Sequence, residues 1–148
     1  LAREITDLAG QLKQKFENFV VIGIGGSALG NIAIQSALNH PEYNFLPNDR
    51  RRGLRLFVPD NIDPDRLHGV LDILDLSKTV FNVITKSGNT AESIATYLIA
   101  RERVIKAVGR EKHCGHFIFT TDAEKGELKK IAAREKAARV VGPGDARQ

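Results

Sequence analysis

The chain has 148 residues, of which 42% are hydrophobic and 27% are charged, and this size and composition are typical of one globular domain with a single core. Its 22 basic and 18 acidic residues give a net charge of +4 and are interspersed, apart from three arginines at 50–52 that we interpret as a solvated loop. This distribution argues against a nucleic-acid-binding surface and mildly favours an anionic ligand.

Cys114 is the only cysteine, which excludes an intramolecular disulfide and a zinc cluster built from cysteines. No apolar stretch approaches the roughly 18 residues that a membrane span requires, and the N-terminus lacks a secretory signal pattern. We therefore expect a cytoplasmic protein that contacts no membrane. Because the sequence contains no methionine, even at position 1, we also expect it to be part of a longer polypeptide.

The first half of the chain alternates between helical and strand patterns. Four apolar residues at helical spacing predict a helix within residues 2–18, namely Ile5, Leu8, Leu12 and Phe16. The apolar runs 19–24 and 54–58 predict the first two strands. Asp63 and Pro64 then supply an N-cap and a first-turn proline for a helix with apolar residues Leu67, Val70, Leu71 and Leu74.

The second half continues the alternation. Residues 79–84 predict a third strand, followed by a long helix with Ile94, Leu98, Arg101, Ile105 and Val108 in register, where Arg101 is the one polar interruption. Residues 116–120 predict a fourth strand. Thr121 and Glu124 have the spacing of a capping box, and Leu128 and Ile131 begin a fifth helical pattern that Gly126 weakens. Residues 139–141 are a candidate short fifth strand.

Short apolar strands that alternate with helices favour parallel pairing and right-handed crossovers, because helices must cover both faces of the sheet. We therefore predict an α/β fold, a three-layer α/β/α sandwich with a mostly parallel five-stranded sheet. Residues 1–148 contain no linker and no repeat, so the prediction is a single domain.

A glycine-rich turn follows the first strand. It contains Gly23, Gly25, Gly26 and Ser27, where glycines let backbone amides approach a ligand and the serine offers a hydroxyl. The spacing is not that of a dinucleotide-binding fingerprint, although Pro59 and Asp60 after the second strand leave a nucleotide as a less favoured alternative.

A polar loop follows the third strand. It places three hydroxyls, an amide and an ammonium in the six residues Thr85, Lys86, Ser87, Gly88, Asn89 and Thr90. Several donors beside a helix N-terminus suit the oxygens of a phosphate monoester. A simpler interpretation is also open, in which Asn89 and Glu92 cap the following helix and Lys86 faces solvent. The lysine position does not fit a nucleotide triphosphatase loop.

Three stretches resemble the glucose-6-phosphate isomerase family: VIGIGGSALG at 21–30, DNIDP at 60–64 and NVITKSGNTAES at 82–93. The resemblance implies that residues 19 to about 131 form the first of two sugar isomerase (SIS) domains with a flavodoxin-like fold. It implies a cytoplasmic enzyme of glycolysis and gluconeogenesis that interconverts glucose-6-phosphate and fructose-6-phosphate without a cofactor or metal, as a homodimer when complete. By motif position it assigns phosphate binding to Gly26, Ser27, Thr85, Lys86, Ser87, Gly88, Asn89 and Thr90.

The chain departs from the family pattern in two ways. Thr85 stands where the family usually has serine, and Asn89 replaces a common threonine, so both positions keep hydrogen-bonding capacity. The family's glutamate base and its arginine, histidine and lysine catalytic residues belong to motifs expected beyond this chain, so we assign no catalytic residue within it. From Arg139 onward the sequence no longer follows the family.

The remaining titratable residues contribute little to the site by this interpretation. His40, His68, His113 and His116 all lie outside the two motifs, which favours surface or structural roles. Glu92 is a candidate for supporting the site, with helix capping as the alternative. Two further functional hypotheses stay open: a phosphosugar-binding module without turnover, such as a sensor, and a remnant that binds nothing.

Overall fold

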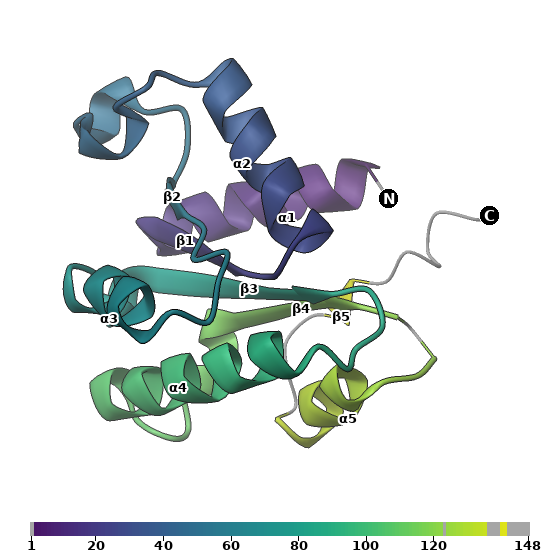
Figure 1. Cartoon of the computed structure of the whole chain (residues 1–148). Coiled ribbons are helices and arrows are strands. Elements are labelled where there is room, and N and C mark those ends of the chain that lie inside the picture. The colour runs from purple at the N-terminus through teal and green to yellow at the C-terminus, as the bar shows by residue number, and fades with distance from the viewer. Residues whose placement is uncertain (1, 123, 136–139, 142–148) are drawn as a thin grey trace.

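A parallel sheet of five strands forms the centre of the computed structural model (Figure 1), which describes residues 2–122, 124–135 and 140–141. The strands lie in the order β2-β1-β3-β4-β5, the order of flavodoxin-like doubly wound sheets. Their bounds are Asn18–Ile22 for β1, Arg55–Phe57 for β2, Thr79–Thr85 for β3, Phe117–Thr121 for β4 and Val140–Val141 for β5. Every pairing is parallel, as predicted for this sheet. Arg139, which the sequence analysis placed in the fifth strand, lies outside the described residues.

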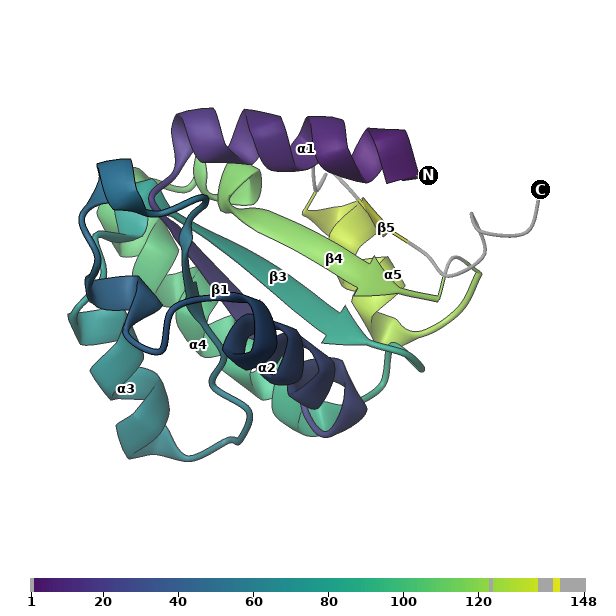
Figure 2. The same ribbon diagram turned by 90° about the horizontal axis from the view of Figure 1, so that it is seen from above.

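Helices cover both faces of this sheet, as the two views show (Figures 1 and 2). α1 (Ala2–Lys15) and α2 (Gly26–Leu38) lie on one face. The other face carries α3 (Pro64–Asp72), α4 (Ala91–Val108) and α5 (Glu127–Arg134). The three-layer arrangement predicted from the alternating pattern is therefore confirmed. Four short 3-10 turns complete the described elements: η1 (Tyr43–Phe45), η2 (Asn48–Arg50), η3 (Leu76–Lys78) and η4 (His113–His116).

The larger hydrophobic core lies between the sheet and the layer of α3, α4 and α5. Tyr97 of α4 packs edge-on against Phe117 and Phe119 of β4, with ring centroids 5.2 and 5.4 Å apart. Edge-to-face aromatic pairs of this kind add about 0.5–1.5 kcal/mol each beyond the burial of their surface. The central strands and α4 are thereby fixed against each other.

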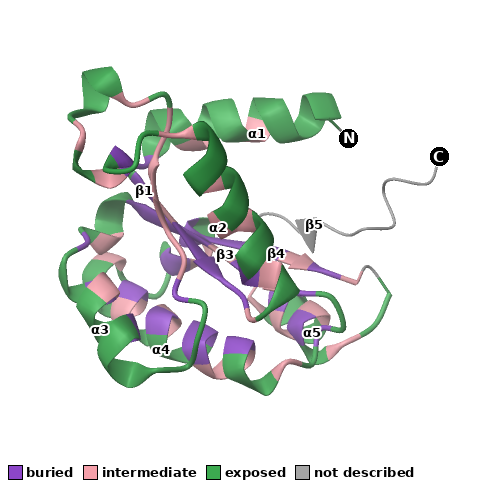
Figure 3. Cartoon of the chain, turned by 45° about the horizontal axis from the view of Figure 1, so that its top comes forward, coloured by how far each residue is buried: buried purple, intermediate pink, exposed green. Residues whose placement is uncertain are grey.

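The opposite face has a much smaller core. Phe16, Val80 and Ile118 are buried there, with Leu8 and Leu12 of α1 packed against them. The burial colouring shows α2 and α1 as mostly exposed helices (Figure 3). On α2 the large apolar side chains of Leu29, Ile34 and Leu38 are all more than half exposed.

Local capping at α3 is as predicted. The Asp63 carboxylate accepts a hydrogen bond from the Arg66 amide at 2.8 Å, and Pro64 occupies the first turn. The side chain thus satisfies one of the amides that a helix start leaves unpaired.

The stripe expected on α4 is confirmed only in part, because Val108 packs against the core but the most deeply buried side chains lie about one position earlier. Leu98 is 53% exposed, and the residues that face the core are Ser93, Thr96, Tyr97, Ala100 and Val104. Apolar residues occur on both sides of this helix, so spacing alone does not choose between faces. The packing of Tyr97 on the β4 phenylalanines decides the face.

The capping box expected at Thr121 and Glu124 is also wrong, because Thr121 is the last residue of β4. The turn is closed instead by Asp122, whose carboxylate accepts hydrogen bonds from the Glu124 and Lys125 amides at 2.8 and 3.1 Å. α5 begins only at Glu127, after Gly126 with a positive φ of 103°.

Within the described ranges, no helix combines the length and apolar character needed to cross a bilayer.

Candidate functional site

The glycine-rich turn and the polar loop lie at the same edge of the sheet. β1 and β3 are parallel neighbours, so the segments that follow them, 23–27 and 85–90, both emerge at their carboxyl ends (Figure 2). Each segment leads directly into a helix, α2 or α4. Two helix N-termini, with their unpaired amides and positive dipole ends, therefore lie at the same edge of the sheet, one on each face.

The turn before α2 depends on glycine. Gly25 is the N-cap residue and has φ of 58° and ψ of −124°, a conformation that residues with a side chain rarely adopt. A methyl group on Gly23 would lie 2.9 Å from the Ser27 Cβ, so this position also excludes larger residues. Gly26 is exposed with open space beside it, and no side chain caps the first turn of α2.

The polar loop is organised around the buried hydroxyl of Thr85. Its Oγ1 accepts hydrogen bonds from the Gly88 amide at 2.9 Å and from the Thr90 hydroxyl at 3.3 Å. The Ser87 hydroxyl accepts from the Asn89 amide at 3.2 Å. Thr85 therefore shapes the loop from within, while Ser87 remains on the surface.

Several donors of this loop are available to a ligand. Lys86 and Ser87 are exposed, and the Lys86 ammonium has no ion-pair partner among the residues that the structure describes. Thr90 is the N-cap of α4, but its side chain does not cap the helix, because its hydroxyl is directed to Thr85. The amides of the first turn of α4 are therefore left without a side-chain acceptor, as an anion-binding helix start requires.

The expectation that Asn89 caps α4 together with Glu92 is wrong. The Asn89 Oδ1 accepts a hydrogen bond from the Glu127 amide at 3.0 Å, and Glu127 is the first residue of α5. Asn89 thus caps a different helix, 38 residues further along the chain. Glu92 lies exposed in the first turn of α4 and makes no capping bond there.

Sequence reasoning missed the residues that hold the loop from the α5 side. The Leu128 amide donates to the Gly88 carbonyl oxygen at 2.9 Å. Gly126 and Gly88 touch through their backbones: a methyl group on Gly126 would lie 2.6 Å from the Ser87 carbonyl oxygen and 2.8 Å from the Gly88 Cα. The only indication in the sequence was a glycine at an unfavourable place for a helix.

The four histidines lie away from both loops. His113 and His116 form η4, which precedes β4 and so lies at the opposite edge of the sheet. His116 is buried, with Nδ1 at 2.8 Å from the Thr79 carbonyl oxygen, and burial lowers the pKa of its imidazole. His40 accepts from the Glu42 amide, and His68 contacts Arg103.

The described geometry suits binding of an anion better than acid-base chemistry. Residues 23–27 and 85–90 contain hydroxyls, amides and one ammonium, but neither segment contains a carboxylate or an imidazole. A dianion between the two helix starts would meet donors from both. A proton-transferring group would have to come from elsewhere.

Comparisons with known proteins agree on one family. The model of the family described as phosphoglucose isomerase matches residues 4–137. The chain is 50% identical over 129 residues to a glucose-6-phosphate isomerase of Carboxydothermus hydrogenoformans, and this match covers 87% of the chain but 28% of that protein. It is 48% identical over 118 residues to the corresponding enzyme of Rubrobacter xylanophilus, covering 80% of the chain and 27% of the relative.

Solved structures give the same result. A crystal structure of a glucose-6-phosphate isomerase from Chlamydia trachomatis superposes with a TM-score of 0.73 at 30% identity, covering 95% of this chain and 25% of that chain. A hypothetical protein from Thermus thermophilus superposes with a TM-score of 0.72, also at 30% identity, covering 95% of this chain and 32% of that one. The chain thus spans about a third or less of the relatives that it matches.

Proposed function

The chain belongs to the phosphoglucose isomerase family, and we propose that it supplies the phosphate-binding part of an enzyme that interconverts glucose-6-phosphate and fructose-6-phosphate. The observation that carries this proposal is that two helices without an N-cap side-chain hydrogen bond, α2 and α4, begin at the same edge of the sheet, with Lys86 and Ser87 exposed in the loop before α4. A sugar phosphate offers the dianion that such a place favours.

The residues have distinct roles in this proposal. The amides at Gly26 and at the start of α4 receive phosphate oxygens, and the hydroxyls of Ser27, Ser87 and Thr90 add donors. Lys86 contributes a positive charge from the surface. Thr85, Gly88 and Asn89 act differently, since their contacts lie within the protein and give the loop its shape.

The complete enzyme is part of the same proposal. The described domain is of the sugar isomerase type, the first of two such domains, and the whole protein is a cytoplasmic homodimer of glycolysis and gluconeogenesis. The base and acid of the reaction belong to the part of the enzyme that this chain does not contain. Glu92 lies just after the polar loop, in the first turn of α4, and supports the site only indirectly, because its own charge would repel phosphate.

Phosphate binding at this distance from the reacting carbons still contributes to catalysis. Isomerisation moves a proton between adjacent carbons through an enediolate, and a fixed phosphate holds those carbons in place against the base. Binding energy from a part of the substrate that does not react is thereby used to lower the barrier.

Isothermal titration of the chain with fructose-6-phosphate, inorganic phosphate and unphosphorylated fructose tests the proposal. We expect the two phosphates to bind and fructose not to bind. Replacing Lys86 or Ser87 by alanine should weaken phosphate binding about tenfold or more, since a hydrogen bond to a charged group contributes about 1.5–3 kcal/mol. Lys106→Ala is the matched control, because it removes the same charge near the far end of α4. At 1.5 Å per residue, this position lies roughly 24 Å along the helix from the N-cap residue Thr90.

The outcomes separate the hypotheses. Unchanged affinity for fructose-6-phosphate and inorganic phosphate in the Lys86→Ala and Ser87→Ala variants, or an equal loss in Lys106→Ala, would refute the assignment of these residues. A folded chain that binds no phosphate would refute the site. A coupled isomerase assay on the same sample should give no turnover, and turnover would mean that a catalytic base lies within this chain.

A further inference from the structure

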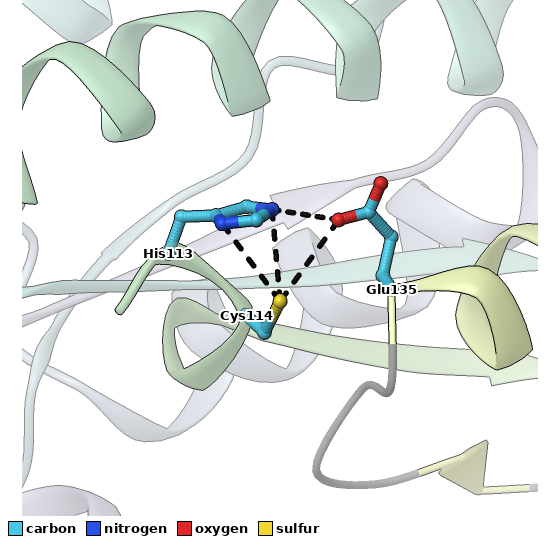
Figure 4. Close-up of side chains that lie close together, drawn as sticks. All are labelled: His113, Cys114 and Glu135. Atoms are coloured by element: carbon cyan, nitrogen blue, oxygen red, sulfur yellow. Dashed lines mark hydrogen bonds and ion pairs between the residues drawn. The ribbon is translucent and has the colours of Figure 1, made fainter. Parts of the chain in front are cut away.

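A second cluster of reactive side chains, His113, Cys114 and Glu135, lies close together (Figure 4), at the edge of the sheet where β4 begins rather than where it ends. His113 and Cys114 are neighbours in η4, and Glu135 follows the last turn of α5. Their ligand atoms all lie within 4.8 Å of one another. His113 is 4% exposed and the Glu135 side chain is 18% exposed, so the cluster is largely shielded from water.

The hydrogen bonds of His113 define where its second nitrogen points. Nδ1 lies 2.5 Å from the Arg110 carbonyl oxygen, which only accepts, so Nδ1 carries a proton. Nε2 then faces the Glu135 Oε2 at 2.6 Å. A nitrogen lone pair and a carboxylate oxygen repel each other at that distance, so a cation must lie between them: either a proton or a metal ion.

The Cys114 sulfur stands where a third metal ligand would be. Sγ lies 3.6 Å from the His113 Nε2 and 3.9 Å from the Glu135 Oε2. With bonds of about 2.3 Å to sulfur and about 2.1 Å to nitrogen and oxygen, a tetrahedral zinc ion separates sulfur from either atom by about 3.6 Å. The nitrogen and oxygen would be about 3.4 Å apart, so only Glu135 has to move outward, by less than about 1 Å.

The surroundings also suit a metal. Arg101 binds the other carboxylate oxygen of Glu135, with Nε at 2.9 Å and Nη2 at 2.8 Å, and leaves Oε2 free to coordinate. The Arg110 carbonyl oxygen orients His113 as outer partners orient metal-bound imidazoles. A thiolate, an imidazole and a carboxylate together favour zinc over magnesium or calcium.

We propose that His113, Cys114 and Glu135 form a three-ligand zinc site with a fourth position open to water or another small ligand. The site joins η4 to the end of α5, the helix whose start holds the polar loop through Leu128. It is independent of the proposed phosphate binding, because it shares no residue with residues 23–27 or 85–90.

Titration of the metal-free chain with Co²⁺ tests the site, because a cobalt–thiolate bond gives a charge-transfer absorption that neither histidine nor carboxylate produces. We expect one Co²⁺ per chain with this band, and its loss when Zn²⁺ is added. Cys114→Ala should abolish the band, and Glu135→Gln should weaken Zn²⁺ binding at least about tenfold. The exposed His68, replaced by asparagine, is the matched control for His113→Asn, and only the His113 change should weaken binding.

A measurement on the unmodified chain guards against variants that fail to fold. Cys114 is the only cysteine, so the rate of its alkylation reports on this site alone. Equimolar Zn²⁺ should slow alkylation at least about tenfold, and a chelator should restore the rate. An unchanged rate, or a cobalt–thiolate band that persists in Cys114→Ala, would overturn the proposal and leave a protonated His113 paired with Glu135.

Discussion

Replacing Gly126 by alanine is the most direct test of how the polar loop is held. Gly126 has φ of 103° and ψ of 155°, a region that residues with a side chain almost never occupy. The added methyl group would also lie 2.6 Å from the Ser87 carbonyl oxygen, a contact with backbone that no side-chain rotation relieves. The backbone strain and the steric contact therefore both arise at residue 126.

The magnitude follows from these two effects. A side chain in this backbone region costs about 1–3 kcal/mol, and overpacking of this kind costs about 1–3 kcal/mol more. We therefore expect Gly126→Ala to lower the free energy of unfolding by about 4 kcal/mol, a large share of the roughly 5–15 kcal/mol typical of a domain. If the backbone shifts to relieve the contact, Ser87 and Gly88 move with it, and phosphate affinity falls.

Urea unfolding followed by far-ultraviolet circular dichroism measures the stability, and titration with inorganic phosphate measures the site. Gly69→Ala is the matched control: Gly69 lies within α3 with nothing within 4 Å of an added methyl group, so we expect about 0.5–1 kcal/mol of stabilisation. A Gly126→Ala chain that unfolds within about 0.5 kcal/mol of the unmodified chain and binds phosphate equally well would refute the reasoning.

Three further predictions concern other contacts. Asn89→Ala should lower the free energy of unfolding by about 1 kcal/mol and speed amide hydrogen exchange at Glu127 of α5 rather than in the first turn of α4. Faster exchange in α4 alone would contradict the capping of α5 by Asn89. Tyr43→Phe should lower the free energy of unfolding in urea by about 1–3 kcal/mol, because the Tyr43 hydroxyl accepts a hydrogen bond from the Gly53 amide at 2.7 Å. An unchanged urea midpoint would count against this bond. His116 should make the free energy of unfolding depend on pH. Burial, with smaller effects from Lys15 and His113, keeps the pKa of its imidazole below the ordinary 6.5. Below pH 6.5 the unfolded chain therefore binds more protons than the folded chain, and the stability falls as the pH drops. His116→Asn, studied with a chelator present, should reduce that slope while keeping a donor for the Thr79 carbonyl oxygen, and an unaltered slope would assign the effect to other groups.

The order and type of the elements could be predicted because they depend on local patterns. Apolar runs such as 79–84 fit only a buried strand, and Asp63 with Pro64 marks a helix start by chemistry within one turn. The two segments of the proposed phosphate site could be located for the same reason, since each follows a strand and precedes a helix. Parallel pairing then brings them to one edge of the sheet.

What could not be predicted depends on partners far away in the sequence. Asn89 has the right position to cap α4, and only the folded chain shows that the Glu127 amide competes for its oxygen. The buried face of α4 likewise depends on where Phe117 and Phe119 stand. The meeting of His113 and Cys114 with Glu135 has no local pattern at all, because two separate elements bring them together.

The backbone contact between Gly88 and Gly126 also bears on how the protein is made. During synthesis β1, β3 and α4 leave the ribosome before α5, so the polar loop exists for a time without its supports from Gly126, Glu127 and Leu128. The loop therefore reaches its final shape only after Leu128 has emerged and docked. A nascent chain that ends before this residue would have every side chain that we assign to phosphate binding, but not the arrangement that the proposed site requires.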